Sequence, residues 1–85
     1  MNNYKIYHID VSDIANLPSY AFKNWTAAAE DFKLSDYIES VSVSTENSEA
    51  DTLKELLTES VKTSDVVKFN SDYFYCNGAS YIRLK

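Results

Sequence analysis

The sequence predicts a small α+β domain, with a mainly antiparallel sheet of about five strands that ends in a three-stranded meander and packs with two helices. Three observations carry this prediction. Residues 61–84 contain three β-rich pieces separated by polar breaks. Two earlier segments alternate apolar and polar residues, and two others repeat apolar residues at three- and four-residue spacing. We therefore expect one compact domain over residues 1–85.

The N-terminal part supplies the first strand and the first helix. Residues 4–11 alternate β-branched and aromatic side chains, and both alternating sets are partly apolar, so we expect this strand to be covered on both faces. Residues 12–19 are expected to form a loop. From Ser19 a helix is predicted, because an aromatic stripe recurs at helical spacing: Phe22, Trp25, Ala29 and Phe32.

The second strand is expected over residues 37–44. Alternation there would place Tyr37, Val41 and Val43 on one face and serines on the other, which is typical of a strand with one wet face. Glu39 falls on the apolar side of this pattern. This end of the strand is therefore expected near an edge of the sheet.

The second helix is expected over about residues 49–62. Ser48 offers its hydroxyl as an N-cap, and Asp51 follows three residues later, as in a capping box. The apolar stripe that would face the sheet consists of Leu53, Leu56, Leu57 and Val61.

The C-terminal meander is expected from strands at residues 65–69, 73–76 and 80–84. Asn77 and Gly78 predict a tight primed turn, because such a turn needs positive φ at both central residues. Alternation assigns a core set of Phe74, Cys76, Ile82 and Leu84, which leaves an exposed tyrosine patch for partner binding: Tyr73, Tyr75 and Tyr81. A helix covering that face is the alternative, and the acidic balance disfavours stacking of nucleic-acid bases there.

Composition limits the class of partner. The net charge is −5 and the pI about 4.6, which disfavours direct binding to nucleic acid or to an anionic membrane. One cysteine cannot form an internal disulfide, and no window has the apolar length of a membrane span. We expect a cytoplasmic protein whose partners are proteins or a basic surface.

Catalytic, cofactor and metal sites are not expected. His8 and Cys76 are the only histidine and cysteine, and no further residues mark a nucleophilic site or a zinc ligand set. The carboxylate pairs lie along predicted solvated helix faces, and one glycine excludes a glycine-rich phosphate loop. A small enzyme is accordingly the least favoured class.

Negative charge is concentrated in the middle of the chain. Residues 30–59 contain nine acidic residues and two lysines. Asp51, Glu55 and Glu59 follow i, i+4 spacing, and like charges at that spacing slightly destabilise a helix. Two interpretations of this acidic helix face stay open. It is either a solvated face or a negatively charged stripe that binds a basic groove of a partner. In the extreme case, such a stripe imitates nucleic-acid phosphates. The second assigns partner binding to Glu46, Glu49, Asp51, Glu55 and Glu59.

Four motifs add a family resemblance. YKIYHI at residues 4–9, ADTLKELL at 50–57, VKTSDVVKF at 61–69 and YFYCNGASYIRL at 73–84 are similar in order and spacing to the small YodL-like domain family of phages and conjugative elements. The chain departs from the family where Ala79, Ser80 and Tyr81 replace a Gly-Phe or Gly-Trp pair. The resemblance implies an accessory protein of a mobile genetic element and supplies no catalytic residues.

The function expected from these features is a non-enzymatic, protein-binding inhibitor. It would block a nucleic-acid-binding host defence protein, as anti-CRISPR and anti-restriction proteins do, through the acidic helix and the tyrosine patch. The alternative is a structural or regulatory accessory module whose sheet edge pairs with a second copy, as a homodimer, or with a larger mobile-element protein.

Overall fold

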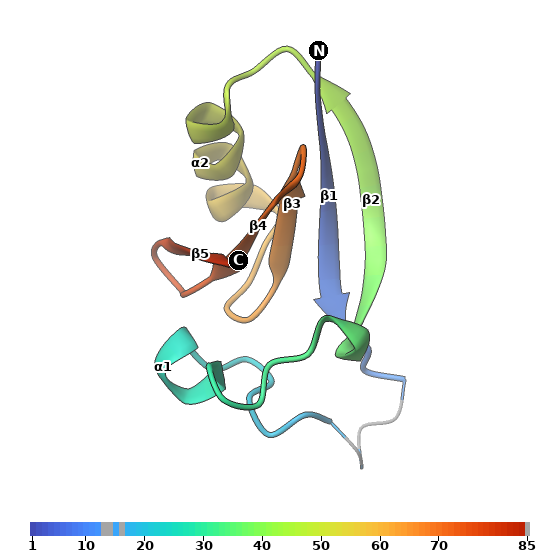
Figure 1. The fold of residues 1–85 in the computed structure, drawn as a ribbon, viewed down its shortest axis with the longest axis vertical. Coiled ribbons are helices and arrows are strands. Elements are labelled where there is room, and N and C mark those ends of the chain that lie inside the picture. Colours follow the sequence, from blue (N-terminus) through green and yellow to red (C-terminus); the bar gives the residue numbers. More distant parts are fainter. Residues whose placement is uncertain (13–14, 16, 85) are drawn as a thin grey trace.

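The chain forms one five-stranded antiparallel sheet in the order β2-β1-β3-β4-β5 (Figure 1). This computed structural model describes residues 1–12, 15 and 17–84. The sheet ends in the expected meander, β3 to β5, and β1 is an inner strand. The strand bounds are Asn2–Ile9 (β1), Tyr37–Thr45 (β2), Val66–Phe69 (β3), Asp72–Cys76 (β4) and Tyr81–Leu84 (β5).

The expected packing of two helices is wrong. Among the described residues, only α2, Glu49–Glu59, exceeds one helical turn. It begins as predicted at Ser48, whose hydroxyl accepts a hydrogen bond from the Asp51 N–H at 3.2 Å. The helix expected from residue 19 onward is reduced to one turn, α1, Trp25–Ala28. Of the loop expected over residues 12–19, residues 13, 14 and 16 lie outside the described part of the chain.

Tertiary hydrogen bonds explain why the first helix is limited to one turn. Phe22 has a φ of 62°, in the left-handed region, which stops a right-handed helix at that residue. Its N–H donates to the Ser64 hydroxyl at 2.9 Å, and the Trp25 N–H donates to the Asn77 side-chain oxygen at 2.7 Å. These side chains satisfy backbone groups that a helix would otherwise pair, so local helical spacing is overridden.

Two apolar clusters cover the two faces of the sheet. On one face, α2 packs over the strands; on the other, the segment that contains α1 brings its aromatic rings against β4. The first cluster contains Ile6, Leu53, Leu56, Val61, Val67, Phe69, Phe74 and Cys76. The second contains Ile9, Tyr20, Ala28, Tyr37, Val66 and Tyr75.

A β-bulge at Ser40 interrupts the pairing of β1 with β2. Ile6 lies opposite Val41, whereas the next residue, Tyr7, lies opposite Glu39. Ser40 is therefore an extra residue on β2 without a counterpart on β1. Such a bulge reverses which face the following side chains point to.

The bulge overturns the alternation expected for this strand. Tyr37 is buried in the second cluster, while Val41 and Val43 lie opposite Ile6 and Tyr4 on the α2 side. The prediction that these three apolar residues share a face is therefore wrong. Glu39 stays on the side of Tyr7 and Tyr37, where its exposed carboxylate pairs with the Lys5 ammonium at 3.2 Å.

The expected primed turn at Asn77 and Gly78 is also wrong. Gly78 has a φ of 93°, but Asn77 is not among the residues with positive φ. β4 and β5 are joined instead by the four residues 77–80, with the Asn77 N–H donating to the Ser80 carbonyl at 2.7 Å. The Asn77 side chain is engaged by Trp25, which favours this wider loop over a tight turn.

Candidate protein-binding groove

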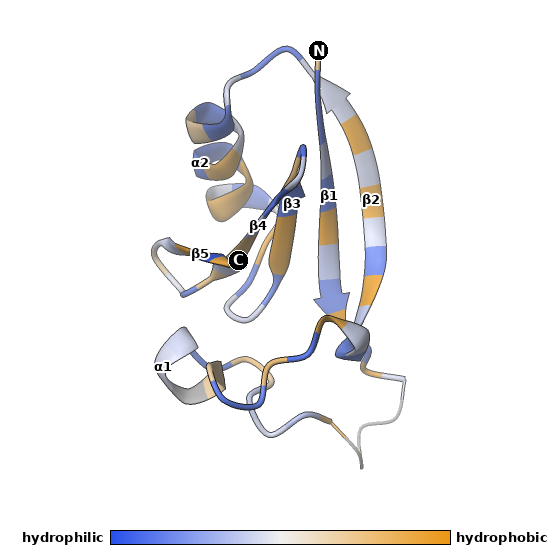
Figure 2. Ribbon diagram, viewed as in Figure 1, coloured by the Kyte–Doolittle hydropathy of each residue, from blue (hydrophilic) through white to orange (hydrophobic). Residues whose placement is uncertain are grey.

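One part of the sheet is left uncovered on the α2 side. In Figure 1, α2 lies beside β3 and β4, whereas β2 forms the far edge of the sheet. Apolar residues recur along β2 (Figure 2), and Ile38, Val41 and Val43 are exposed. Pairing with β1 places the two valines on the α2 side. Exposed apolar side chains gathered on one surface are typical of a contact site.

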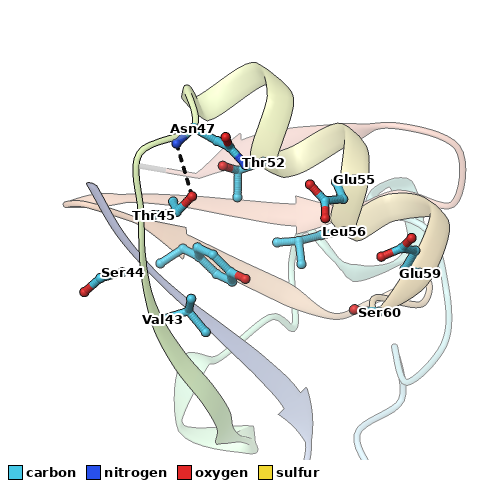
Figure 3. Close-up of a pocket in the computed structure, with 10 residues that line it drawn as sticks. Val43, Ser44, Thr45, Asn47, Thr52, Glu55, Leu56, Glu59 and Ser60 are labelled. Atoms are coloured by element: carbon cyan, nitrogen blue, oxygen red, sulfur yellow. Dashed lines mark hydrogen bonds between the residues drawn. The ribbon is translucent and has the colours of Figure 1, made fainter. Parts of the chain in front are cut away.

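A groove separates this surface from α2 (Figure 3). Its volume is about 260 Å³. β1 and β2 form one wall, α2 forms the other, and the loop that joins β2 to α2 closes one end. The lining residues are Tyr4, Val43, Ser44, Thr45, Asn47, Thr52, Glu55, Leu56, Glu59 and Ser60.

The groove carries uncompensated negative charge. The Glu55 and Glu59 side chains project from α2 toward it (Figure 3), and no ion pair among the described residues engages either carboxylate. Thr52 lies one turn before Glu55 and Leu56 and is only 4 % exposed. Its hydroxyl has no hydrogen-bond partner within the described part of the chain. A buried, unpaired hydroxyl is uncommon and points to a missing partner.

Only part of the predicted acidic set reaches this groove. Glu55 and Glu59 line it, whereas Glu46, Glu49 and Asp51 do not. Glu46 is exposed in the loop before α2, Glu49 is half-buried in the first turn, and Asp51 is exposed there. The last two lie at the positive end of the helix dipole, where acidic side chains stabilise a helix.

The predicted tyrosine patch does not form. Tyr75 is 0 % exposed, and its hydroxyl donates to the Lys23 carbonyl at 2.7 Å. Tyr81 packs on the opposite cluster, under α2, and its hydroxyl donates to the Leu53 carbonyl at 2.9 Å. Tyr73 is half-buried near the second cluster. The three tyrosines therefore do not share one face of the meander: Tyr73 and Tyr75 lie on the side of the α1 segment, and Tyr81 lies under α2.

Burial of these rings has a consequence for alkaline stability. Burial raises the pKa of Tyr75 to about 12 and also raises the pKa values of Tyr20, Tyr37 and Tyr81 above the ordinary value. Because the folded pKa is the higher one, the stabilisation is complete below about pH 10 and is lost as the pH rises toward 12. Each such tyrosine lowers the free energy of unfolding by up to about 1.4 kcal/mol for every pH unit in that range.

We therefore expect the fold to unfold steeply between about pH 10 and pH 12, with tyrosinate absorbance appearing together with loss of circular dichroism. The chain unfolded in urea is the control, and its tyrosinate absorbance should rise at lower pH. Coincident titration of the folded and unfolded chains would contradict this expectation.

A second hollow, of about 490 Å³, lies on the other side of Ser60, which lines both. It is bordered by His8 and Asp65 and by exposed apolar side chains, among them Phe22, which is 56 % exposed. The strained φ of Phe22 holds this ring out of the core. The uncovered surface thus extends from the acidic groove to an apolar end.

The His8–Asp65 pair is the element that sequence reasoning missed. His8 Nδ1 lies 2.8 Å from an Asp65 carboxylate oxygen, which also accepts the Lys62 N–H at 2.8 Å. The residues are far apart in the sequence, and no local motif marks them. Cys76, the other residue considered for chemistry, is buried, and that burial raises the pKa of its thiol. A raised thiol pKa is the reverse of what a nucleophilic thiolate needs.

Comparison with known proteins gives no relative for this chain: no family model, curated protein or solved structure matches it. No helix in the described part of the chain has the length and apolar character to cross a membrane. Among those same residues, no group of three or more histidine, cysteine, aspartate or glutamate side chains could hold a metal ion.

Proposed function

We propose that this chain is a small, non-enzymatic protein that binds a basic surface of a partner protein and inhibits it by covering a nucleic-acid-binding site. The observation that supports this most directly is the uncovered sheet surface beside α2, where exposed apolar residues adjoin the unpaired Glu55 and Glu59. The motif resemblance suggests the setting, with a phage or conjugative element as the source and a host defence protein as the target.

The physical argument combines two contributions. Exposed Ile38, Val41 and Val43 supply apolar area that gains free energy when a partner removes it from water. The acidic residues of α2 accelerate encounter with a positive surface and disfavour partners of like charge. A surface that binds nucleic acid is positive and accessible, so it meets both requirements.

A test of this function starts with capture of the tagged protein's partners from a bacterial lysate, at about 50 mM and again at about 300 mM salt. We expect a stoichiometric nucleic-acid-binding protein that is released at the higher salt and displaced by excess duplex DNA. Charge reversal by Glu55→Lys and Glu59→Lys should abolish capture.

The matched control is Glu30→Lys with Asp31→Lys, which reverses two exposed acids outside α2 and should leave capture intact. If both double variants lose the partner equally, net charge and not the groove decides binding. A partner that resists high salt and duplex DNA would refute inhibition at a nucleic-acid site.

A second candidate function, self-association as an accessory module, is favoured by the free edge of β2. Residues 40–44 read Ser-Val-Ser-Val-Ser in either direction, carry no charge and have no strand beyond them in the described sheet. Two copies paired antiparallel about Ser42 would place Val41 opposite Val43 of the second copy. This function predicts a mass near twice 9.7 kDa that does not change with salt.

A further inference from the structure

We propose that the groove between α2 and β2 holds a single arginine side chain of the partner protein. This inference rests on the proposed function and assigns the chemistry of the contact. The groove's volume, about 260 Å³, is below the roughly 300–1,000 Å³ of sites that enclose small-molecule ligands, and it suits one long side chain.

The groove also offers some contact to the stem of such a side chain. Tyr4 and Val43 lie on the strand side and Leu56 on the helix side, so each wall adds a small apolar area to a lining that is mostly polar. Arginine buries its methylene groups along surfaces of this kind while its charged head reaches polar groups. The Tyr4 ring adds a π-face on which a guanidinium can stack.

The polar groups of the groove match the head. Glu55 and Glu59 offer two carboxylates one helical turn apart, and neither is used in an ion pair among the described residues. Independently of these charges, the buried Thr52 hydroxyl lacks a hydrogen-bond partner there and points from α2 toward Thr45 and Asn47 (Figure 3). The hydroxyl oxygen lies just beneath the groove surface, and a donor that reaches it would satisfy a group that the fold leaves unpaired.

The number and arrangement of acceptors favour arginine over lysine. A guanidinium presents five N–H donors in a planar fork, binds carboxylates in pairs and stacks on aromatic rings. Lysine offers a compact ammonium with three donors and a stronger hydration shell. An aromatic wall with two carboxylates and one hydroxyl therefore fits the planar head better.

The probe for this site is a Gly-Arg-Gly peptide with blocked ends, titrated into the isotope-labelled protein and followed by amide chemical shifts. The largest shifts are expected at Thr52, Glu55 and Glu59, with saturable binding. Two peptides that replace the arginine serve as matched controls: citrulline keeps the shape without the charge, and lysine keeps the charge without the planar fork. Both should bind at least about fivefold more weakly.

Variants of the protein test the assigned acceptors. The double variant Glu55→Gln and Glu59→Gln should lower the affinity for the arginine peptide at least about tenfold. The control double variant Glu30→Gln and Asp31→Asn should leave that affinity unchanged. Thr52→Val keeps the shape and removes the hydroxyl, so it should weaken binding several-fold while leaving the melting temperature equal or higher. That second readout separates loss of a contact from loss of the fold.

The outcomes also separate this inference from the proposed function. The arginine assignment is overturned if the lysine or citrulline peptide binds equally well, if the shifts map outside the groove, or if Thr52→Val binds normally. If the arginine peptide does not bind but a salt-sensitive partner is still captured through Glu55 and Glu59, the proposed function is supported and only the arginine assignment is refuted. Groove binding of the peptide without any salt-sensitive partner would instead refute the function.

Discussion

Replacing Tyr75 with alanine is expected to lower the free energy of unfolding by about 4 kcal/mol, the range measured for large-to-small changes at buried aromatic residues. The ring is fully buried, with the Trp25 ring 4.9 Å away and the Phe32 ring 5.8 Å away, measured between centroids. Its removal would leave a cavity between the sheet and the α1 segment and an unpaired Lys23 carbonyl.

The expected loss is large relative to the whole fold. A domain of 85 residues is stable by roughly 4–13 kcal/mol, so the Tyr75→Ala chain would be close to half unfolded at the lower end of that range. Urea unfolding followed by circular dichroism gives the change. Tyr75→Phe is the matched control, because it keeps the ring and should cost only about 1 kcal/mol. A loss below about 1 kcal/mol in Tyr75→Ala would show that the ring is not packed as described.

Removal of the Asp65 carboxylate is expected to lower the free energy of unfolding by about 3 kcal/mol, because two hydrogen-bonding contacts to a charged group are lost. Asp65 is 4 % exposed, and its carboxylate accepts the Lys62 N–H and pairs with His8, both at 2.8 Å. The Asp65 side chain therefore holds the residues just before β3 in place and links β1 to β3. In Asp65→Ala the Lys62 N–H loses its acceptor and His8 loses its partner, so the free energy of unfolding falls because two contacts are lost at once.

The comparison that checks this origin is His8→Gln. That variant leaves Asp65 bonded to the Lys62 N–H and removes only the half-exposed partner, so its loss should stay near 1 kcal/mol. Urea midpoints of the two variants give the difference. Equal losses would assign the whole effect to the contact between His8 and Asp65, and an Asp65→Ala variant with unchanged stability would contradict the role of the buried carboxylate.

Features that depend on local sequence were predictable. The Ser48 cap, the start of α2 and the meander strands follow from spacing and capping chemistry within a few residues. The short length of the first helix was not predictable, although its apolar residues do have helical spacing. The N–H groups of Phe22 and Trp25 donate to side chains more than forty residues later, those of Ser64 and Asn77. Propensity carries no information about such distant acceptors.

The candidate site was predictable to a similar degree. Charge spacing identified Glu55 and Glu59, because i, i+4 residues share one helix face. The other wall of the groove was not foreseen, since simple alternation places Val43 on the same face as Tyr37, whereas the bulge at Ser40 separates them and leaves Val43 opposite Tyr4 on the α2 side. The tyrosines were misassigned for a different reason, because alternation within a strand does not tell which face a distant segment covers.

The extra residue at Ser40 changes the alternation of side chains between the two faces of β2. Without it, β2 would present Tyr37 to the same layer as Val41 and Val43, and one layer of the protein would lose an aromatic contribution. With it, the first part of the strand serves the core under the α1 segment and the second part serves the open surface beside α2. One strand thus contributes Tyr37 to the packed interior and Val41 and Val43 to the exposed surface, and Ser40 lies between them.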